Sequence, residues 1–263
     1  MNKTLIAGGL AFAAGLLAST AQAEPAPSAA KPTVVLVHGA FADSSSWNGV
    51  IAALQHDGYS VVAAPDNLRG VRADADVVAD VVKGISGPVV LVGHSYGGSV
   101  ISEAAEGAAN VKALVYVAAF APEAGETALG LTGKFPGSTL GPTLAPPVPL
   151  ADGGNDLYIQ QTRFPAQFAA DVPEPQARLM AAGQRPIAEA ALSEASTAPA
   201  WKHVPSWFIY GDADRNIPPA AMKFMAQRAA ARETVVVKGA SHVVMVSHPT
   251  QVAQLIERAA KAP

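Results

Sequence analysis

One serine of the chain lies where it could act as a nucleophile. The run Gly93-His94-Ser95-Tyr96-Gly97-Gly98 directly follows the apolar stretch 89–92 and opens a segment with helical spacing. The glycines around Ser95 permit a sharp strand-to-helix turn, whose strained backbone costs on the order of 1–3 kcal/mol. A sequence that needed only a turn would avoid that cost. We therefore predict that Ser95 is a nucleophile rather than part of an ordinary glycine-rich turn.

A serine hydroxyl needs a base to react at neutral pH, and the chain offers six histidines. His242 follows the predicted strand 234–237, in the turn Gly239-Ala240-Ser241-His242. Sites in parallel sheets form at the carboxyl ends of the strands, so we expect His242 on the same edge as Ser95. The other five histidines are less suited to act as the base. His38 is expected to hold a turn, His56 and His248 lie at helix ends, and His94 adjoins Ser95 and cannot fold back onto its hydroxyl. His203 lies just ahead of a predicted strand, with no partner indicated.

An acidic side chain is needed to orient the histidine and to stabilise its protonated form. The predicted strand 206–210 runs into a loop with two candidates, Asp212 and Asp214. Asp212 lies one residue after a turn glycine, where it can cap or bend the loop. Asp214 lies further out, where it can reach His242, so we favour Asp214.

Acyl transfer also requires N–H groups that bind the developing oxyanion. One donor is predicted to be the backbone N–H of Tyr96, at the helix start beside Ser95. The other is expected from the loop His38-Gly39-Ala40-Phe41 after the first strand. The N–H of Ala40 is preferred, with that of Phe41 as the alternative.

Alternating strands and helices must position these groups. Continuous apolar β-branched runs predict buried strands, and apolar residues at helical spacing predict amphipathic helices. The predicted strands are 33–37, 60–63, 88–92, 111–118, 206–210 and 234–237, and the predicted helices are 46–55, 73–83, 96–107, 220–231 and 249–261. This alternation indicates an α/β fold with a mainly parallel central sheet and helices on both faces.

The alternation stops between residues 122 and 200, which are rich in Pro, Gly and Ala. The prolines of 141–149 exclude a regular helix there, whereas 165–170 and 174–182 have short helical patterns. Aromatic residues at Tyr158, Phe164 and Phe168 favour a packed lid over a loose spacer. We therefore expect a core in two parts, 32–121 and 201–263, with residues 122–200 inserted as a lid.

The first 23 residues have the pattern of a secretory signal peptide. Lys3 supplies the positive charge, residues 5–17 the apolar segment, and Ala21-Gln22-Ala23 the small residues of a cleavage site. An apolar run of about 13 residues is shorter than the roughly 18–20 that span a bilayer, so cleavage after Ala23 is preferred over an uncleaved anchor. With 24–31 as a linker, the mature protein is expected to be exported, either periplasmic or secreted, without stable membrane insertion.

Composition excludes several classes of function. The 263 residues include 18 Lys and Arg, 21 Asp and Glu, a net charge of −3 and no cysteine. Without a basic excess, nucleic acid is not an expected partner. The absence of cysteine excludes cysteine-ligated metal sites, and the sequence has neither a metal-spaced cluster of ligands nor a dinucleotide-binding glycine motif, so no metal and no other cofactor is predicted. Nothing in the sequence indicates an oligomeric state.

These motifs resemble those of the α/β-hydrolase superfamily over essentially the whole mature chain. The likeness is greatest to small bacterial esterases related to plant methyl-salicylate esterases and hydroxynitrile lyases. The resemblance implies that the acid is the Asp four residues before Pro218, which is Asp214, and that a lid follows the strand near 118–120. Four segments carry the likeness: Val37-His38-Gly39-Ala40-Phe41, residues 93–98, Gly211-Asp212-Ala213-Asp214 and the turn 239–242.

The resemblance also bears on the reaction. Plant-type lyases carry Lys after the catalytic His and Thr after the first-strand His, where this chain has Val243 and Gly39. This difference makes a hydroxynitrile-lyase-like activity the weaker alternative. Motif adjacency places Phe41, Phe120 and Val243 near the nucleophile, either as substrate contacts or as ordinary core residues.

We therefore predict a carboxylesterase-type serine hydrolase that forms an acyl-enzyme on Ser95. The lid has few charges, which favours small to medium uncharged esters as the small-molecule partner. Cleavage of a lactone, amide or carbon–carbon bond is an alternative that would use the same residues. A non-catalytic binding protein would normally have lost one of the three residues Ser95, Asp214 and His242.

Overall fold

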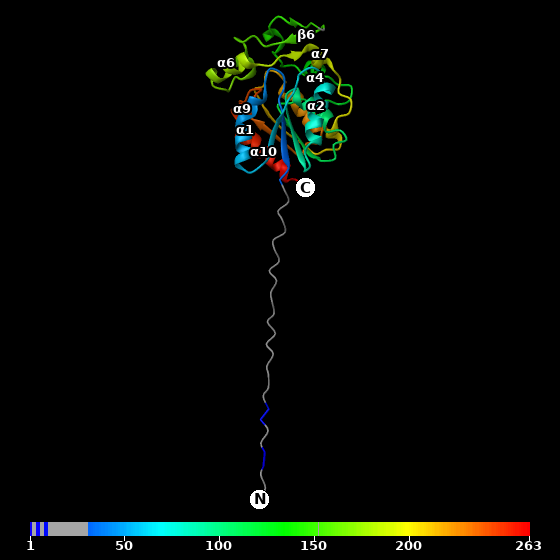
Figure 1. Cartoon of the computed structure of the whole chain (residues 1–263). Coiled ribbons are helices and arrows are strands. Elements are labelled where there is room, and N and C mark those ends of the chain that lie inside the picture. Colours follow the sequence, from blue (N-terminus) through cyan, green and yellow to red (C-terminus); the bar gives the residue numbers. More distant parts are fainter. Residues whose placement is uncertain (2–3, 6–7, 10–30, 152) are drawn as a thin grey trace. The chain divides into compact units, whose positions relative to one another are not determined.

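The computed structural model describes residues 1, 4–5, 8–9, 31–151 and 153–263 (Figure 1). It divides into two units, Met1–Ala30 and Lys31–Pro263. Most of the predicted signal peptide and linker therefore lies outside the described residues. No helix in the described part of the chain has both the length and the apolar character that a membrane crossing requires.

A parallel sheet forms the centre of the second unit, with the strand order β2-β1-β3-β4-β8-β9 (Figure 1). Its strands are β1 (Thr33–Val37), β2 (Val61–Ala64), β3 (Val89–His94), β4 (Val111–Val117), β8 (Ser206–Gly211) and β9 (Glu233–Val237). Every residue of β3 is buried, as expected for a continuous apolar strand that is covered on both faces. The strand order reverses direction between β1 and β3, and ligand sites of open α/β sheets form at such a point.

Helices cover both faces of this sheet (Figure 1). One face carries α1 (Asn48–His56) and α10 (Pro249–Lys261), and the other carries α2 (Val71–Lys83) and α3 (Gly97–Ala104). The remaining core helices are α8 (Pro219–Arg228) and the short η1 (Ser44–Trp47), η3 (Ala200–Lys202) and α9 (Val244–Ser247). The structure confirms the predicted fold class, an α/β fold with a parallel central sheet between helical layers.

The segment between β4 and β8 contains more regular structure than its sequence indicates. Its helices are α4 (Ala128–Lys134), α5 (Phe164–Phe168), α6 (Glu174–Gly183), α7 (Glu189–Ser193) and the single turn η2 (Gly141–Thr143). A small antiparallel sheet joins β5 (Val148–Pro149), β6 (Asn155–Leu157) and β7 (Ile187–Ala188). Strands of two or three residues are too short to show an alternating pattern, which explains why the sheet is not predictable.

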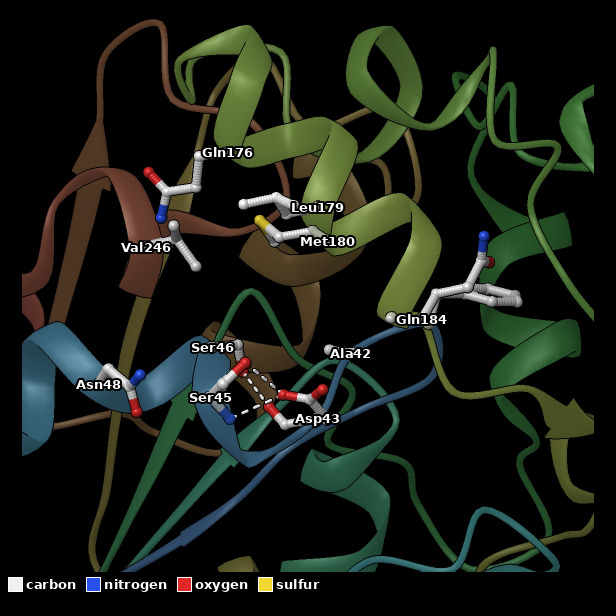
Figure 2. A pocket seen from close by; sticks show the side chains of 12 residues that line it. Ala42, Asp43, Ser45, Ser46, Asn48, Gln176, Leu179, Met180, Gln184 and Val246 are labelled. Carbon is white, nitrogen blue, oxygen red and sulfur yellow. Dashed lines mark hydrogen bonds between the residues drawn. The ribbon is translucent and has the colours of Figure 1, made fainter.

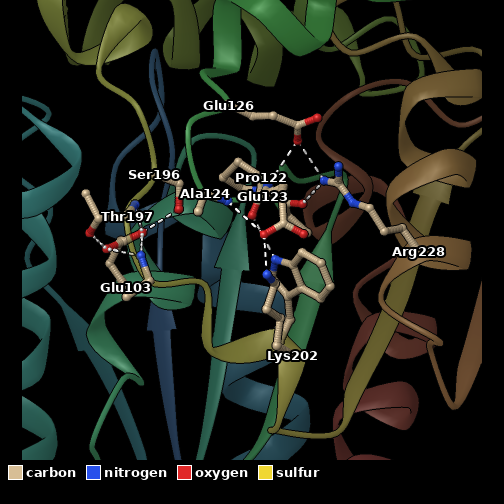
Figure 3. Close-up of polar contacts among 12 residues, drawn as sticks. Glu103, Pro122, Glu123, Ala124, Glu126, Ser196, Thr197, Lys202 and Arg228 are labelled. Carbon is tan, nitrogen blue, oxygen red and sulfur yellow. Dashed lines mark hydrogen bonds and ion pairs between the residues drawn. The ribbon is translucent and has the colours of Figure 1, made fainter.

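Polar contacts attach both ends of this lid segment to the core (Figure 3). Glu103 of α3 accepts hydrogen bonds from Ser196 Oγ, from the N–H and Oγ1 of Thr197 at 2.7 and 2.6 Å, and from the N–H of Ala198 at 3.1 Å. Burial alone would raise the pKa of the Glu103 carboxyl, but the hydrogen bonds from these donors together lower it by more. The pKa of Glu103 therefore lies below its ordinary value. Glu103 is therefore a charged anchor for the returning end of the lid.

The outgoing end of the lid is held by a second set of contacts, also drawn in Figure 3. Arg228 Nη2 donates to the carbonyl of Ala121 at 2.9 Å and to Glu126 Oε2 at 2.8 Å. Lys202 forms an ion pair with Glu123. Both ends of the lid segment are thus held by charged groups of the core.

Candidate active site

Ser95 lies on the turn between β3 and α3, with a φ of +54°. This left-handed conformation is strained for a residue with a side chain. A Cβ atom on Gly93 would lie 2.5 Å from the carbonyl oxygen of Gly97, and one on Gly98 would lie 2.2 Å from that of Phe120. The close approach of backbone to backbone therefore requires both glycines, in agreement with the sequence argument.

The structure brings Ser95, His242 and Asp214 together. His242 Nε2 lies 2.9 Å from Ser95 Oγ, and His242 Nδ1 lies 2.7 Å from Asp214 Oδ2. Asp214 Oδ1 also accepts hydrogen bonds from the N–H groups of Asn216 and Ile217, at 2.7 and 3.0 Å. All three side chains are buried, so their mutual hydrogen bonds are shielded from water. They come from the loops after β3, β8 and β9.

The competing acid, Asp212, makes a different contact. Its Oδ1 accepts a hydrogen bond from the N–H of Gly239 at 2.6 Å. Asp212 therefore links the loop after β8 to the loop that carries His242. This is the bending role that the sequence allowed for Asp212, and it leaves Asp214 as the carboxylate that contacts His242.

His94 supports His242 through a contact that sequence reasoning did not identify. The two rings lie 4.8 Å apart between centroids, and His94 Nε2 lies 3.2 Å from the carbonyl oxygen of His242. Burial lowers the pKa of His94 well below its usual value, so the ring is neutral. A carbonyl can only accept, so the proton of His94 is on Nε2 and holds the His242 backbone in place.

The two predicted oxyanion donors face no acceptor in the described part of the chain: the N–H groups of Ala40 and Tyr96 make no hydrogen bond there. The alternative donor, the N–H of Phe41, is engaged with the carbonyl of Arg185 at 2.9 Å. A Cβ atom on Gly39 would lie 2.7 Å from Ser95 Cβ, so the first-strand loop passes directly over the nucleophile. The geometry therefore leaves Ala40 and Tyr96 available.

The side chain of Tyr96 is fixed by a buried carboxylate. Its hydroxyl donates to Asp74 Oδ2 at 2.8 Å, and the same oxygen accepts from the N–H groups of Arg69 and Gly70 at 3.0 and 3.2 Å. Burial raises the pKa of Tyr96, so the hydroxyl stays protonated and remains a donor. Asp74 thus stabilises the residue whose backbone N–H faces the reacting centre, and no sequence motif indicated this contact.

A cavity of about 280 Å³ opens at Ser95 and His242. Its walls are mainly apolar and come largely from the lid, with Ala128, Leu129, Leu140, Leu144, Leu157, Phe168 and Leu192 among the lining residues. Phe41 and Phe120 line the cavity as expected for substrate contacts. Val243 is not among the residues that line it and is fully buried, which agrees with the alternative that the sequence left open there, an ordinary core residue. Successive residues in a turn point in different directions, so adjacency to His242 did not place Val243 in the cavity wall.

A second hollow of about 240 Å³ lies between η1 and the lid helix α6 (Figure 2). Phe41 is the single described residue that lines both spaces, and its ring packs edge-to-face against Phe168 at 6.1 Å. In the second hollow the amide of Gln184 is already bonded to the backbone of Ile159 and Ala181. Phe41 therefore forms a wall between an apolar cavity at Ser95 and a more polar hollow outside it.

Among the described residues, no group of three or more histidine, aspartate or glutamate side chains is arranged to hold a metal ion.

The sequence is also similar to known hydrolases. A model of the alpha/beta hydrolase family matches residues 34–255. The carbendazim hydrolyzing esterase of Nocardioides sp. (strain SG-4G) is 34% identical over 113 aligned residues, and the match covers 38% of this chain and 47% of that protein, about half of that relative. The alpha/beta hydrolase nvfD of Aspergillus novofumigatus (strain IBT 16806) is 25% identical over 253 aligned residues, and the match covers 88% of this chain and 97% of that one.

Solved structures share the fold. Polyneuridine aldehyde esterase superposes with a TM-score of 0.76 at 19% identity, over 87% of this chain and 99% of that one. An extracellular alpha/beta-hydrolase from a Paenibacillus species superposes with a TM-score of 0.69 at 22% identity, over 88% and 100%. The match of the family model to most of the chain confirms the resemblance seen in the motifs, and the chain belongs to the alpha/beta hydrolase family.

Proposed function

We propose that this protein is a serine carboxylic ester hydrolase for small to medium uncharged esters. The observation that carries the proposal is the continuous series of hydrogen bonds from Ser95 Oγ through His242 to Asp214, placed at the mouth of an apolar cavity. Names of related proteins, such as carbendazim hydrolyzing esterase, agree with ester chemistry. Family membership alone would support hydrolysis without specifying the bond.

The first half of the reaction uses all the groups at this site. Ser95 Oγ attacks the ester carbonyl carbon while its proton passes to His242 Nε2. The carbonyl oxygen becomes an oxyanion that accepts hydrogen bonds from the N–H groups of Ala40 and Tyr96. Asp214 keeps the proton of His242 on Nδ1 and stabilises the imidazolium. The bond to the leaving alkoxide then breaks, and His242 returns its proton to form the alcohol.

The second half regenerates the enzyme. A water molecule gives a proton to His242 Nε2 and attacks the carbonyl carbon of the acyl-serine. The oxyanion forms again beside Ala40 and Tyr96. When it collapses, the acid leaves and Ser95 Oγ recovers its proton from His242, so one water is consumed for each ester cleaved.

The cavity supports an uncharged substrate. Among the described residues that line it, Glu189 is the one carboxylate and His242 the one histidine, and there is no lysine or arginine. An anionic substrate would therefore meet no countercharge in these walls, and burying an unpaired charge is costly. A volume of about 280 Å³ would hold a short or medium acyl group.

Lactone, amide and carbon–carbon bond cleavage would use the same three side chains. Assays with substrates of each kind are therefore needed to distinguish these reactions from ester hydrolysis. A cyanide-releasing lyase is less well supported, because the position after His242 is the apolar and fully buried Val243. The signal-peptide pattern at residues 1–23 extends the proposal to an exported hydrolase that acts outside the cytoplasm.

The test is hydrolysis of p-nitrophenyl esters with acyl chains of two to twelve carbons, by protein beginning at Glu24. We expect turnover that is abolished in Ser95→Ala. Ser99→Ala is the matched control, because Ser99 lies four residues further along the same turn and helix and its buried hydroxyl has no partner among the described residues. Activity that survives in Ser95→Ala would contradict the proposal. Turnover of amides or lactones but not of esters would show that the enzyme cleaves another bond.

A further inference from the structure

Two buried carboxyl groups meet beside the side chain of Tyr96. Asp66 follows β2 and Asp74 lies in the first turn of α2, and both are fully buried. Their side chains are in hydrogen-bond contact with each other. Two carboxylates in contact inside a protein cannot both be ionised without a large cost, because like charges repel and both are removed from water. The pair therefore needs either a proton or a buried positive charge.

Hydrogen bonds indicate which carboxyl carries a proton. Asp74 Oδ2 accepts from the Tyr96 hydroxyl at 2.8 Å and from two backbone N–H groups at 3.0 and 3.2 Å, whereas Asp66 Oδ1 accepts from the N–H of Leu68 at 3.1 Å. The other two oxygens, Asp66 Oδ2 and Asp74 Oδ1, are buried without a partner among the described residues. A proton on Asp66 Oδ2 that is donated to Asp74 Oδ1 satisfies both of them. Asp74, with more donors and a place at the start of a helix, is the better anion.

Nearby arginines do not replace this proton. The positive charge of Arg185 acts on Asp66, but its side chain is exposed, and the two oxygens without a partner stay so in the described part of the chain. Arg69 Nη1 donates to Asp156 at 2.7 Å instead. A cation at the surface is screened by water and compensates a second buried charge only weakly.

The other titratable groups described near the pair add no positive charge either. Burial lowers the pKa of His38, which favours its neutral form. Tyr96 is a protonated donor, and Glu194 of the lid adds negative charge beside it. Burial and the charge of Asp74 together raise the pKa of Asp66 well above its usual range, in agreement with the hydrogen-bond pattern.

We infer that Asp66 and Asp74 share one proton, which Asp66 Oδ2 donates to Asp74 Oδ1, and that neutral Asp66 is a positioning residue for Tyr96. Asp74 is held by this proton on one oxygen and holds the Tyr96 hydroxyl with the other. The backbone N–H of Tyr96 is the proposed oxyanion donor, so the pair acts on the reaction through Tyr96. The positioning role rests on the proposed ester hydrolysis, whereas the shared proton does not.

The first experiment measures whether the folded protein keeps a proton on Asp66. Asp66→Asn is the matched variant, since its amide offers an acceptor to Leu68 and a donor to Asp74 but cannot titrate. An unfolded chain releases the Asp66 proton near pH 3.9. If the folded pKa is higher, the stability that neutral Asp66 contributes is full below that pH and falls as pH rises toward the folded pKa, by a factor of about ten per pH unit.

Urea unfolding of both proteins between pH 5 and 7 gives the result. We expect the unfolding equilibrium constant of the wild type, divided by that of Asp66→Asn, to rise about 100-fold over these two pH units. Asp76→Asn is the control, because Asp76 is exposed on the same helix as Asp74, and its ratio should stay constant. A constant ratio for Asp66→Asn would show that Asp66 is ionised and would overturn the inference.

A second measurement observes the proton directly. In protein labelled with ¹³C at the aspartate side-chain carboxyl carbons, the signal of Asp66 is the one that is missing from Asp66→Asn. We expect this signal at the chemical shift of a neutral carboxyl group at pH 7. The shift of a carboxylate at pH 7 would contradict the inference, whether or not the protein hydrolyses esters.

Steady-state kinetics on a p-nitrophenyl ester at pH 7 test the positioning role. Asp66→Leu cannot donate to Asp74, so we expect kcat to fall about 10-fold with little change in KM, which is part of the roughly 10²–10³-fold that loss of an oxyanion donor costs. Tyr96→Phe leaves the pair intact but removes its contact with Tyr96, so its kcat should fall similarly. Asp66→Asn should keep at least about half of the wild-type kcat, because it restores the donor.

These variants separate positioning from a general loss of structure. If Asp66→Leu does not fold, Tyr96→Phe decides. An unchanged kcat in folded Asp66→Leu or in Tyr96→Phe, or a loss in Asp66→Asn as large as in Asp66→Leu, would overturn the positioning role. A wild type that cleaves no ester would instead refute the proposed function, and the unfolding and ¹³C measurements would still test the shared proton.

Discussion

Replacing Glu103 by Gln should loosen the returning end of the lid. The carboxylate receives hydrogen bonds from four groups of Ser196, Thr197 and Ala198 (Figure 3). A glutamine keeps one oxygen acceptor, but it replaces the other with an NH₂ group that faces donors. At least two charge-assisted hydrogen bonds are therefore lost or inverted.

The size of the effect follows from these contacts. Hydrogen bonds to charged groups contribute about 1.5–3 kcal/mol each when buried. Glu103 is only partly buried, and exposed charge pairs contribute about 0–1 kcal/mol, so we expect a total of about 1–2 kcal/mol. In a core of this size, 1 kcal/mol lowers Tm by roughly 2–4 °C, which predicts a fall of about 2–8 °C.

The loss of stability in Glu103→Gln should depend on pH. Because the folded pKa of Glu103 is lowered, its contribution is present above the unfolded value of about 4.3 and is lost as pH falls through the folded pKa. The difference between wild type and Glu103→Gln should therefore be full at pH 7 and should shrink below about pH 4.

The assay is urea unfolding followed by tryptophan fluorescence at pH 7, 5, 4 and 3. Glu174→Gln is the control, since among the described residues that exposed carboxylate pairs with Arg178 alone, one turn away on α6, and should contribute less than about 0.5 kcal/mol. Equal midpoints for wild type and Glu103→Gln at pH 7, or a difference that is unchanged at pH 3, would show that the Glu103 carboxylate does not anchor the lid.

Two further substitutions test the site itself. Asp214→Asn should reduce kcat by roughly 10³–10⁴-fold with little change in KM, because the amide no longer keeps the proton of His242 on Nδ1, and steady-state kinetics on the best p-nitrophenyl ester will show this. Gly39→Ala should reduce kcat/KM by at least about 10²-fold, because the added methyl would lie 2.7 Å from Ser95 Cβ, and an unchanged rate would show that the loop can move away.

Much of the fold and the close approach of three side chains could be predicted because both depend on local patterns. Strand 33–37 and helix 249–261 have the bounds that their apolar patterns indicate. Ser95, Asp214 and His242 each follow a strand, and parallel strands bring their carboxyl ends to one edge, where the structure places the three residues in contact.

The contacts that could not be predicted join residues that no motif pairs, whereas Ser95 and His242, 147 positions apart, belong to one set of motifs that each follow a strand. Tyr96 and Asp74 are 22 positions apart, and His94 reaches the backbone of His242 across 148 positions. No periodic pattern encodes such pairs. Likewise, Val243 follows His242 directly but turns out to be a core residue, because the conformation of the turn decides its direction.

The proposed reaction requires that Ser95 is a nucleophile activated by His242. The most direct measurement is reaction with a fluorophosphonate, followed by intact mass and peptide mapping. We expect one adduct, on Ser95, absent in Ser95→Ala and formed at least about 10³-fold more slowly in His242→Ala. An adduct on any other residue, or labelling that persists in Ser95→Ala, would contradict it.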